Sequence, residues 1–127
     1  NNSIYGKTVN SFNSLSLNPP MVLFSLGNYS SSIKKFSKTK FLSINILSSK
    51  QKKLSDNFAL TEPNLEDIKF IKGKNKTIII PNCIANLECE LMEKIKRGDH
   101  IIFVCKILEL QSNDKLKPLV YFNSKYF

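Results

Sequence analysis

The pattern of apolar and polar positions predicts a mainly β chain. Residues 21–26 form a short continuous apolar run that fits one buried strand, and the run ends at Gly27. Residues 41–47 alternate well enough for another strand, with Asn45 as a polar position inside it. The β-branched and aromatic residues of the segment 4–12 predict a strand there as well.

The last third of the chain is predicted to be β throughout. Residues 78–80 are apolar, and Leu87, Cys89 and Leu91 alternate with Glu88 and Glu90. That alternation predicts a half-buried strand whose two carboxylates face solvent. A turn is expected at 97–100, followed by a long strand over 101–110 and a short one over 119–122.

Two short helices interrupt the strands. A serine run precedes Ile33 and Phe36, which are spaced as on one helix face. Leu54 and Phe58, at i and i+4, predict a second helix that begins near Ser49. Lys34 and Lys35 then fall in the first turn, where a bound anion would compensate their charge; a general lysine bias is the simpler explanation. The polar segment 60–75 is predicted to be an excursion or lid.

Together these elements favour a small barrel of antiparallel strands, because closure removes exposed sheet edges. The uninterrupted β run at the end does not fit an alternating βαβ fold. A chain of 127 residues is enough for one domain, spanning residues 1–127.

Composition limits the function classes. The net charge of +9 is compatible with nucleic acid or with a local phosphate site, but Arg97 is the only arginine, and nucleic-acid readers use arginine heavily. We therefore expect no nucleic-acid partner. No apolar run approaches the roughly 20 residues of a membrane span, and no signal-peptide pattern is visible.

The three cysteines are odd in number and lack CxxC spacing. This predicts buried, reduced thiols in a cytoplasmic protein, with no metal site.

Four stretches, in this order, resemble the flavin reductase-like family. They are GKTVNSFNSLSLNPP at 6–20, the serines at 30–32, the segment from 41–47 on to Phe58-Ala59, and Gly98-Asp99-His100 with 118–121 and Lys125-Tyr126. Two positions depart from the family pattern: Cys105 stands where glycine is common, and Lys125 where arginine is common. The family also has a helix and a strand before the position of Gly6, so we expect this chain to lack its N-terminal elements.

The resemblance implies a fold, an activity and partners. The fold would be the FMN-binding split β-barrel with short inserted helices, working as a homodimer. The activity would be hydride transfer from NADH or NADPH to N5 of FMN or FAD, with reduced flavin passing to a partner monooxygenase. The alternative is a non-enzymatic flavin-binding or electron-carrier module of a larger redox protein, since fold alone does not fix function.

The resemblance also implies site residues. Six would line the flavin ring: Thr8, Val9, Asn10, Ser11, Ser14 and Ser16. The flavin phosphate would lie near Ser30, Ser31 and Ser32. Asn45 and Gln51 would contact the ribityl chain or the phosphate, with Lys50 or Lys52 adding charge. His100 is the candidate catalytic residue on the nicotinamide side, without being an essential acid, and Tyr126 would close the pocket.

Judged without the resemblance, the same residues have simpler explanations. Serine and asparagine dominate turns, an internal asparagine is usually a satisfied amide, and a lone histidine after Gly-Asp is usually a turn residue.

Overall fold

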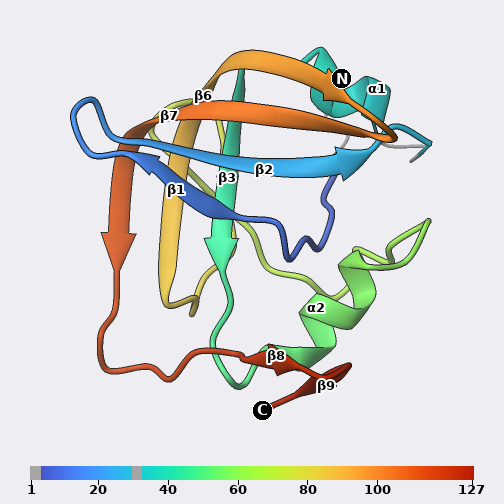
Figure 1. Ribbon diagram of the computed structural model, residues 1–127. Helices are drawn as coiled ribbons and strands as arrows, with labels where there is room; N and C mark the ends of the chain where they lie inside the picture. Colours follow the sequence, from blue (N-terminus) through green and yellow to red (C-terminus); the bar gives the residue numbers. More distant parts are fainter. Residues whose placement is uncertain (1–3, 30–32) are drawn as a thin grey trace.

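The computed structural model describes residues 4–29 and 33–127 (Figure 1). Its elements in chain order are β1 (Asn13–Ser16), β2 (Met21–Gly27), α1 (Ile33–Ser37), β3 (Phe41–Ile46), α2 (Lys52–Phe58), β4 (Ile71–Lys72), β5 (Ile78–Ile79), β6 (Ala85–Arg97), β7 (His100–Ser112), β8 (Tyr121–Phe122) and β9 (Lys125–Tyr126). The expected mainly β chain with two short helices is confirmed. The strand predicted over 119–122 is shorter than expected. The polar segment 60–75 contains the short strand β4.

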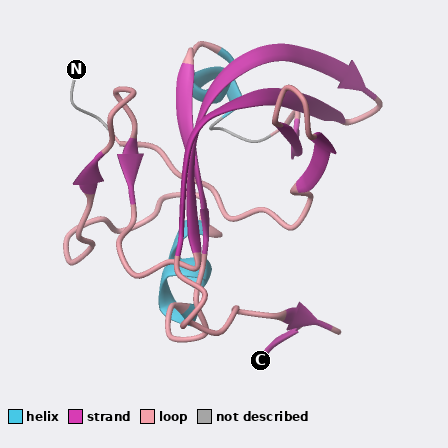
Figure 2. Cartoon of the chain, turned by 90° about the vertical axis from the view of Figure 1, so that its left-hand side faces the viewer, coloured by secondary structure: helices cyan, strands magenta, loops and turns pink. Residues whose placement is uncertain are grey.

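Five strands form the main antiparallel sheet, in the order β1-β2-β7-β6-β3. The long strands β6 and β7 are joined by a two-residue loop, in which Gly98 has φ 59°. Positive φ at this loop position suits the right-handed twist of a hairpin and favours glycine. Register shifts lie between Glu88 and Cys89 and between Leu91 and Glu93, and the β6–β7 hairpin bends strongly (Figures 1 and 2).

The core lies on the face of the sheet that the alternation predicts. In β2, Val22, Phe24 and Leu26 are buried while their neighbours are half-buried. Phe103 of β7 is fully buried and stacks on Phe24, with ring centroids 5.1 Å apart. Such offset aromatic stacking adds to the apolar area that the two rings bury.

The prediction of a strand over residues 4–12 is wrong. This segment is fully described and forms no strand; the first strand begins at Asn13. Its polar groups bond elsewhere: Thr8 N–H donates to the Phe58 carbonyl of α2, and the Ser11 hydroxyl bonds the backbone of Ser25. Because those partners lie on a helix and on one residue of β2, the segment forms no ladder.

The prediction that Glu88 faces solvent is also wrong. Its side chain is buried, with only 5% of the residue exposed, although it alternates with the buried Leu87 and Cys89. The β4–β5 hairpin covers this second face of β6 and bonds the carboxylate.

The two helices are too short to support the argument that lysines in a first helical turn call for a bound anion. In the five residues of α1, the first and last turns overlap, so Lys34 and Lys35 belong to the last turn as well as the first. The conflict with the helix dipole that would have called for an anion therefore disappears. In the second helix, Lys50 and Gln51 precede the first helical residue, Lys52.

All three cysteines are buried free thiols, as expected. Burial raises the pKa of Cys89 to about 12 and that of Cys105 to about 11, so both are uncharged core side chains. Among residues 4–29 and 33–127, no group of three histidine, cysteine or acidic side chains could hold a metal ion. Within those same ranges, no helix is long and apolar enough to cross a membrane.

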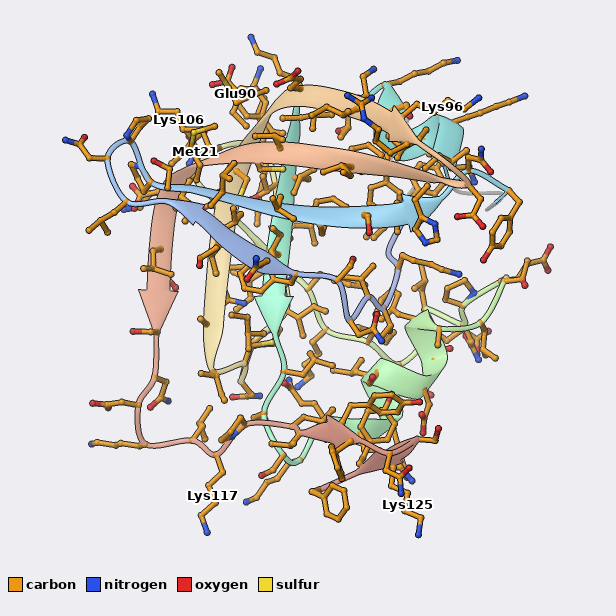
Figure 3. The ribbon with its side chains drawn as sticks, viewed as in Figure 1. Met21, Glu90, Lys96, Lys106, Lys117 and Lys125 are labelled. Atoms are coloured by element: carbon orange, nitrogen blue, oxygen red, sulfur yellow. The ribbon has the colours of Figure 1, made fainter. Side chains whose placement is uncertain are left out.

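Lysines lie at both ends of the molecule. Lys96 and Lys106 lie toward opposite ends of the main sheet, whereas Lys117 and Lys125 lie near the chain end below it (Figure 3).

Candidate functional site

One large cavity lies between the main sheet and α2, with a volume of about 850 Å³. The segment 4–12, the end of β2, α1, β3, α2, residues 76–80 and the C-terminal hairpin all contribute to its wall. That volume falls in the usual range for small-molecule and cofactor sites, roughly 300–1,000 Å³.

The charged side chains of this wall are all basic. Lys7, Lys35 and Lys76 line the cavity, as does His100, and no aspartate or glutamate of the described chain lines it. Lys35 places its Nζ 4.0 Å from the centroid of the Tyr5 ring. A cleft lined by one sign of charge concentrates ligands of the opposite sign, so this cavity favours an anion.

The segment 4–12 is fixed against α2. The Thr8 hydroxyl donates to the Ser55 carbonyl at 2.7 Å, and its N–H donates to the Phe58 carbonyl at 3.1 Å. At Gly6, a Cβ would lie 2.6 Å from Cε1 of Phe58, so only glycine permits this approach. Thr8, Val9, Asn10 and Ser11 consequently line the cavity.

Ser11 holds its place through the backbone of β2. Its hydroxyl donates to the Ser25 carbonyl and accepts from the Ser25 N–H, both at 2.9 Å. Ser14 and Ser16 belong to β1 and lie outside the cavity wall, Ser14 being exposed and Ser16 half-buried. Of the six residues predicted to line the flavin, the first four therefore lie on the cavity wall, and Ser14 and Ser16 do not.

Asn45 lines the cavity, but its amide already has partners within the protein. Its Oδ1 accepts from the Ile80 N–H at 3.1 Å and from Asn86 Nδ2 at 2.7 Å, and its Nδ2 donates to the Ser43 hydroxyl. This network ties β3 and β6 to the chain just beyond β5, so Asn45 shapes the wall.

Gln51 is buried beside α2 and is not part of the cavity wall. Its Oε1 accepts from the Ser48 N–H at 2.9 Å, and its Nε2 donates to the Pro81 carbonyl at 2.9 Å. Both ends of the amide thereby fix the entry of α2.

His100 begins β7 and lies on the cavity wall, paired with its neighbour. Its Nδ1 is 2.7 Å from Oδ1 of Asp99, and 46% of the histidine side chain is exposed. The hydrogen bond with His100, together with the attraction between the two groups, lowers the pKa of Asp99. The carboxylate can thus orient the imidazole ring through Nδ1.

Tyr126 closes the cavity from the C-terminal hairpin. Its hydroxyl is 2.6 Å from that of Ser55, a buried residue of α2, and its ring lies 5.0 Å from the ring of Tyr121. Figure 1 shows β8 and β9 directly beside α2, which agrees with this bond. Ser55 therefore joins two predicted site residues, since its carbonyl holds Thr8 and its hydroxyl holds Tyr126.

Over residues 2–127, the chain matches the family described as "Flavin reductase like domain". It belongs to the flavin reductase-like family. Among its relatives, the FMN reductase (NADH) SmoA of Agrobacterium fabrum is 35% identical over 109 residues, which cover 86% of this chain and 63% of SmoA. A probable flavin reductase of Rhizobium meliloti is 32% identical over 123 residues, which cover 96% of this chain and 39% of that relative. The chain thus spans less than two thirds of the length of either relative.

Solved structures of the family share the fold. The flavin reductase PheA2 in its native state superposes with a TM-score of 0.90 at 32% identity, covering 100% of this chain and 82% of PheA2. The flavin reductase HpaC, complexed with NADP+, has a TM-score of 0.86 at 33% identity, covering 97% of this chain and 80% of HpaC. The split β-barrel implied by the family resemblance is thereby confirmed.

The predicted phosphate residues of this flavin reductase-like chain, Ser30, Ser31 and Ser32, lie outside the described residues. Of the other predicted residues, Thr8, Val9, Asn10, Ser11, Asn45, His100 and Tyr126 come together at the cavity, whereas Ser14, Ser16 and Gln51 do not line it.

One polar cluster at the cavity edge was not predicted. Glu88 Oε1 accepts from the Asn75 N–H at 2.9 Å and from the Thr77 hydroxyl at 2.7 Å, and the Lys74 N–H also bonds this carboxylate. Burial alone would raise the pKa of Glu88, but these hydrogen bonds outweigh it and hold the pKa below its ordinary value of 4.5. The sequence signal that was available is Gly73, which begins the turn over the carboxylate.

Glu88→Gln tests this cluster through stability, because it keeps the shape and an acceptor but removes the charge. We expect the free energy of unfolding to fall by about 1–3 kcal/mol at pH 7. The lowered pKa means that the carboxylate stabilises the fold above pH 4.5 and loses this contribution as the pH falls further. Urea unfolding between pH 7 and pH 3.5 should therefore show the difference between the two proteins shrinking as the pH falls.

Glu90→Gln, two residues along the same strand and only partly buried, is the matched control. It should change the free energy of unfolding by less than about 0.5 kcal/mol. A Glu88→Gln deficit that stays constant down to pH 3.5 would contradict the ionised state of this carboxyl.

Proposed function

We propose that this protein is an NAD(P)H-dependent flavin reductase, which binds FMN or FAD in the main cavity and passes a hydride from a nicotinamide to flavin N5. The observation that carries the proposal is a cavity of about 850 Å³ lined by three lysines and a histidine, with no carboxylate from the described residues. Flavin nucleotides and nicotinamide dinucleotides are both anionic through their phosphates. Membership of the family, and relatives named FMN reductase (NADH) and flavin reductase, support the same activity.

The cavity wall fits a flavin in chemistry as well as in size. Phe12, Phe36 and Phe58 supply apolar surface for a ring system, while Thr8 to Ser11 bring backbone groups and small side chains to one edge. Bound there, the flavin and the nicotinamide would supply the redox chemistry themselves, and the protein would supply position and electrostatics. Because the cofactors would carry the hydride chemistry, the site needs no nucleophile from the protein.

Each predicted residue has a role in the proposal. Thr8, Val9, Asn10 and Ser11 orient the flavin edge, and Asn45 supports the ribityl side of the wall. His100 and Tyr126 lie on the nicotinamide side, where the histidine orients the nucleotide and balances negative charge on the reduced flavin. Ser30, Ser31 and Ser32 remain our proposal for the flavin phosphate, with Ser14, Ser16 and Gln51 acting from outside the wall.

The assembly and the partner belong to the same proposal. At the C-terminal hairpin, Val120, Tyr121, Phe122 and Phe127 expose 45%, 52%, 69% and 66% of their surface, an apolar patch that a second copy of the chain would cover. A homodimer would then complete the site at its interface. Relatives named as reductase components, such as that of a trigonelline monooxygenase, support the transfer of reduced flavin to an oxygenase. Buried free thiols agree with a cytoplasmic location.

Anaerobic bleaching of FMN tests the activity directly. The full chain is mixed with FMN under anaerobic conditions, NADH or NADPH is added, and flavin absorbance is followed. Bleaching that depends on the protein establishes the reductase and identifies the preferred nucleotide. FMN binding without bleaching would replace the proposal by an electron-carrier module, and absence of FMN binding would remove both.

A further inference from the structure

The loop 73–77, between β4 and β5, is folded around the buried carboxylate of Glu88. Backbone N–H groups of Lys74 and Asn75 and the Thr77 hydroxyl converge on this side chain. The Gly73 N–H donates to the Thr77 carbonyl at 2.8 Å, which closes the loop. A Cβ on Gly73 would collide with Glu88 Oε1 and lie 2.6 Å from the Thr77 hydroxyl oxygen, so a larger residue here would displace the carboxylate from the loop. The conformation of the loop is therefore set by Glu88.

The β4–β5 hairpin is also tied to the cavity wall. The Ser43 hydroxyl of β3 donates to the Ile78 carbonyl, and the Ile80 N–H donates to Asn45 Oδ1 at 3.1 Å. The loop is thus held between β6, through Glu88, and β3. The backbone from which a side chain of this loop reaches the cavity is therefore held in place.

Lys76 is the lysine that this loop presents to the cavity. It has φ 60°, a conformation that costs a non-glycine residue roughly 1 kcal/mol or more, and it lines the wall. Lys74, two residues earlier, instead lies 3.8 Å from Glu109 and is not part of the wall. Within residues 4–29 and 33–127, no acidic side chain lies within ion-pair distance of Lys76.

We propose that Lys76 binds a phosphate group of the nucleotide ligand, and that Glu88 is the positioning residue that holds its loop in place. The proposal rests on the proposed function and adds a phosphate contact to it. An ammonium group is a compact charge with three donors, which suits a phosphate oxygen. Because the loop is already held, its backbone needs no ordering when a ligand binds.

Two ligands carry such a phosphate, and a single variant distinguishes them. In the full chain, Lys76→Met keeps the length of the aliphatic stem and removes the charge. If the flavin supplies the phosphate, FMN binding should weaken about tenfold while riboflavin, which lacks a phosphate, binds as before. If the nicotinamide dinucleotide supplies it, KM for NADH should rise by a similar factor, with no change for dihydronicotinamide riboside.

Lys74→Met is the matched control from the same loop and should change none of these values. Equal weakening of FMN and riboflavin, or no change for FMN and NADH alike, would overturn the phosphate contact. The unchanged protein is measured in parallel: if it bleaches FMN normally and Lys76→Met has no effect, the reductase stands and this proposal fails. If it binds no flavin at all, both fail.

Glu88→Gln tests the positioning role by the direction of its effect. Removal of a negative charge near the cavity should by itself strengthen phosphate binding. A loosened loop should instead weaken, by about threefold to tenfold, the ligand that Lys76→Met weakens, FMN or NADH, and leave riboflavin or dihydronicotinamide riboside unchanged. The double variant with Lys76→Met should bind that ligand no more weakly than Lys76→Met alone, because Glu88 would act through Lys76. Additive losses, or tighter binding of that ligand by Glu88→Gln, would overturn the positioning role.

Thr77→Val is the second variant, in case Glu88→Gln folds poorly. It removes one of the hydrogen bonds to the carboxylate but keeps the charge of Glu88. It should weaken the ligand that Lys76→Met weakens, FMN or NADH, by about twofold to threefold, and leave riboflavin or dihydronicotinamide riboside unchanged. Unchanged binding of that ligand by a folded Thr77→Val protein would also contradict the role of the loop.

Discussion

Phe103→Ala is expected to lower the free energy of unfolding by about 3–5 kcal/mol, the range found when a buried aromatic side chain is truncated. Phe103 has no exposed surface and lies on β7, the central strand of the five-stranded sheet. Its ring stacks on Phe24 at 5.1 Å between centroids and 11° between planes. Truncation removes both the buried apolar area and this stacking, and it leaves a cavity between two paired strands.

Urea unfolding followed by far-UV circular dichroism measures this effect. Tyr29→Ala is the control, because it also truncates an aromatic ring to alanine, at a residue that is 81% exposed and lies outside the C-terminal hairpin. The control should shift the free energy of unfolding by less than about 0.5 kcal/mol. A loss below about 1 kcal/mol for Phe103→Ala would mean that the ring is not the centre of this core.

The positions of the core strands could be predicted because each strand needs only local information. In β2, the buried positions alternate with half-buried ones, and in β7 the run from Phe103 to Cys105 is buried. A period of two identifies the two faces of a strand. It does not say whether a second layer covers the polar face, and that is why Glu88 was misplaced.

The burial of Glu88 depends on a loop eleven residues earlier in the chain that folds back over β6. Gly73 marks a turn, but neither Gly73 nor Thr77 indicates by itself that this loop folds over Glu88. The prediction of a strand over residues 4–12 was wrong for a related reason. The composition of this segment suits a strand, but a strand also needs a neighbouring strand with free backbone groups to bond. Here Thr8 finds its partners on α2 instead.

The candidate site was predictable as a region but not residue by residue. Thr8, Asn45, His100 and Tyr126 are far apart in sequence, and the fold brings all four to one cavity. Local sequence cannot tell whether a polar side chain is satisfied within the protein or faces a ligand. Gln51 has both ends of its amide bonded internally, which only the three-dimensional arrangement of Ser48 and Pro81 reveals.

His100→Asn is expected to lower kcat for NADH-dependent flavin reduction by about tenfold to a hundredfold, less than the loss of a fully buried electrostatic group, because the histidine is partly exposed. The ring lies on the cavity wall, and Asp99 holds its Nδ1 at 2.7 Å. Hydride transfer brings negative charge to the flavin, and a correctly oriented imidazole stabilises that charge at the moment it develops. FMN affinity should stay unchanged, since the proposed flavin contacts lie on Thr8 to Ser11.

Stopped-flow reduction under anaerobic conditions separates the hydride step from nucleotide binding in this variant. Asp99→Asn should have a smaller effect, because the imidazole remains but loses its charged partner, and Arg97→Gln on the same turn should have none. If His100→Asn weakens NADH binding while the rate at saturating NADH is unchanged, the histidine only orients the nucleotide. If neither value changes, His100 is a residue of the β6–β7 turn without a part in the reaction. A slower hydride step at saturating NADH, with FMN affinity intact, would place His100 in the hydride-transfer step itself, because a residue of the turn alone would not change that rate.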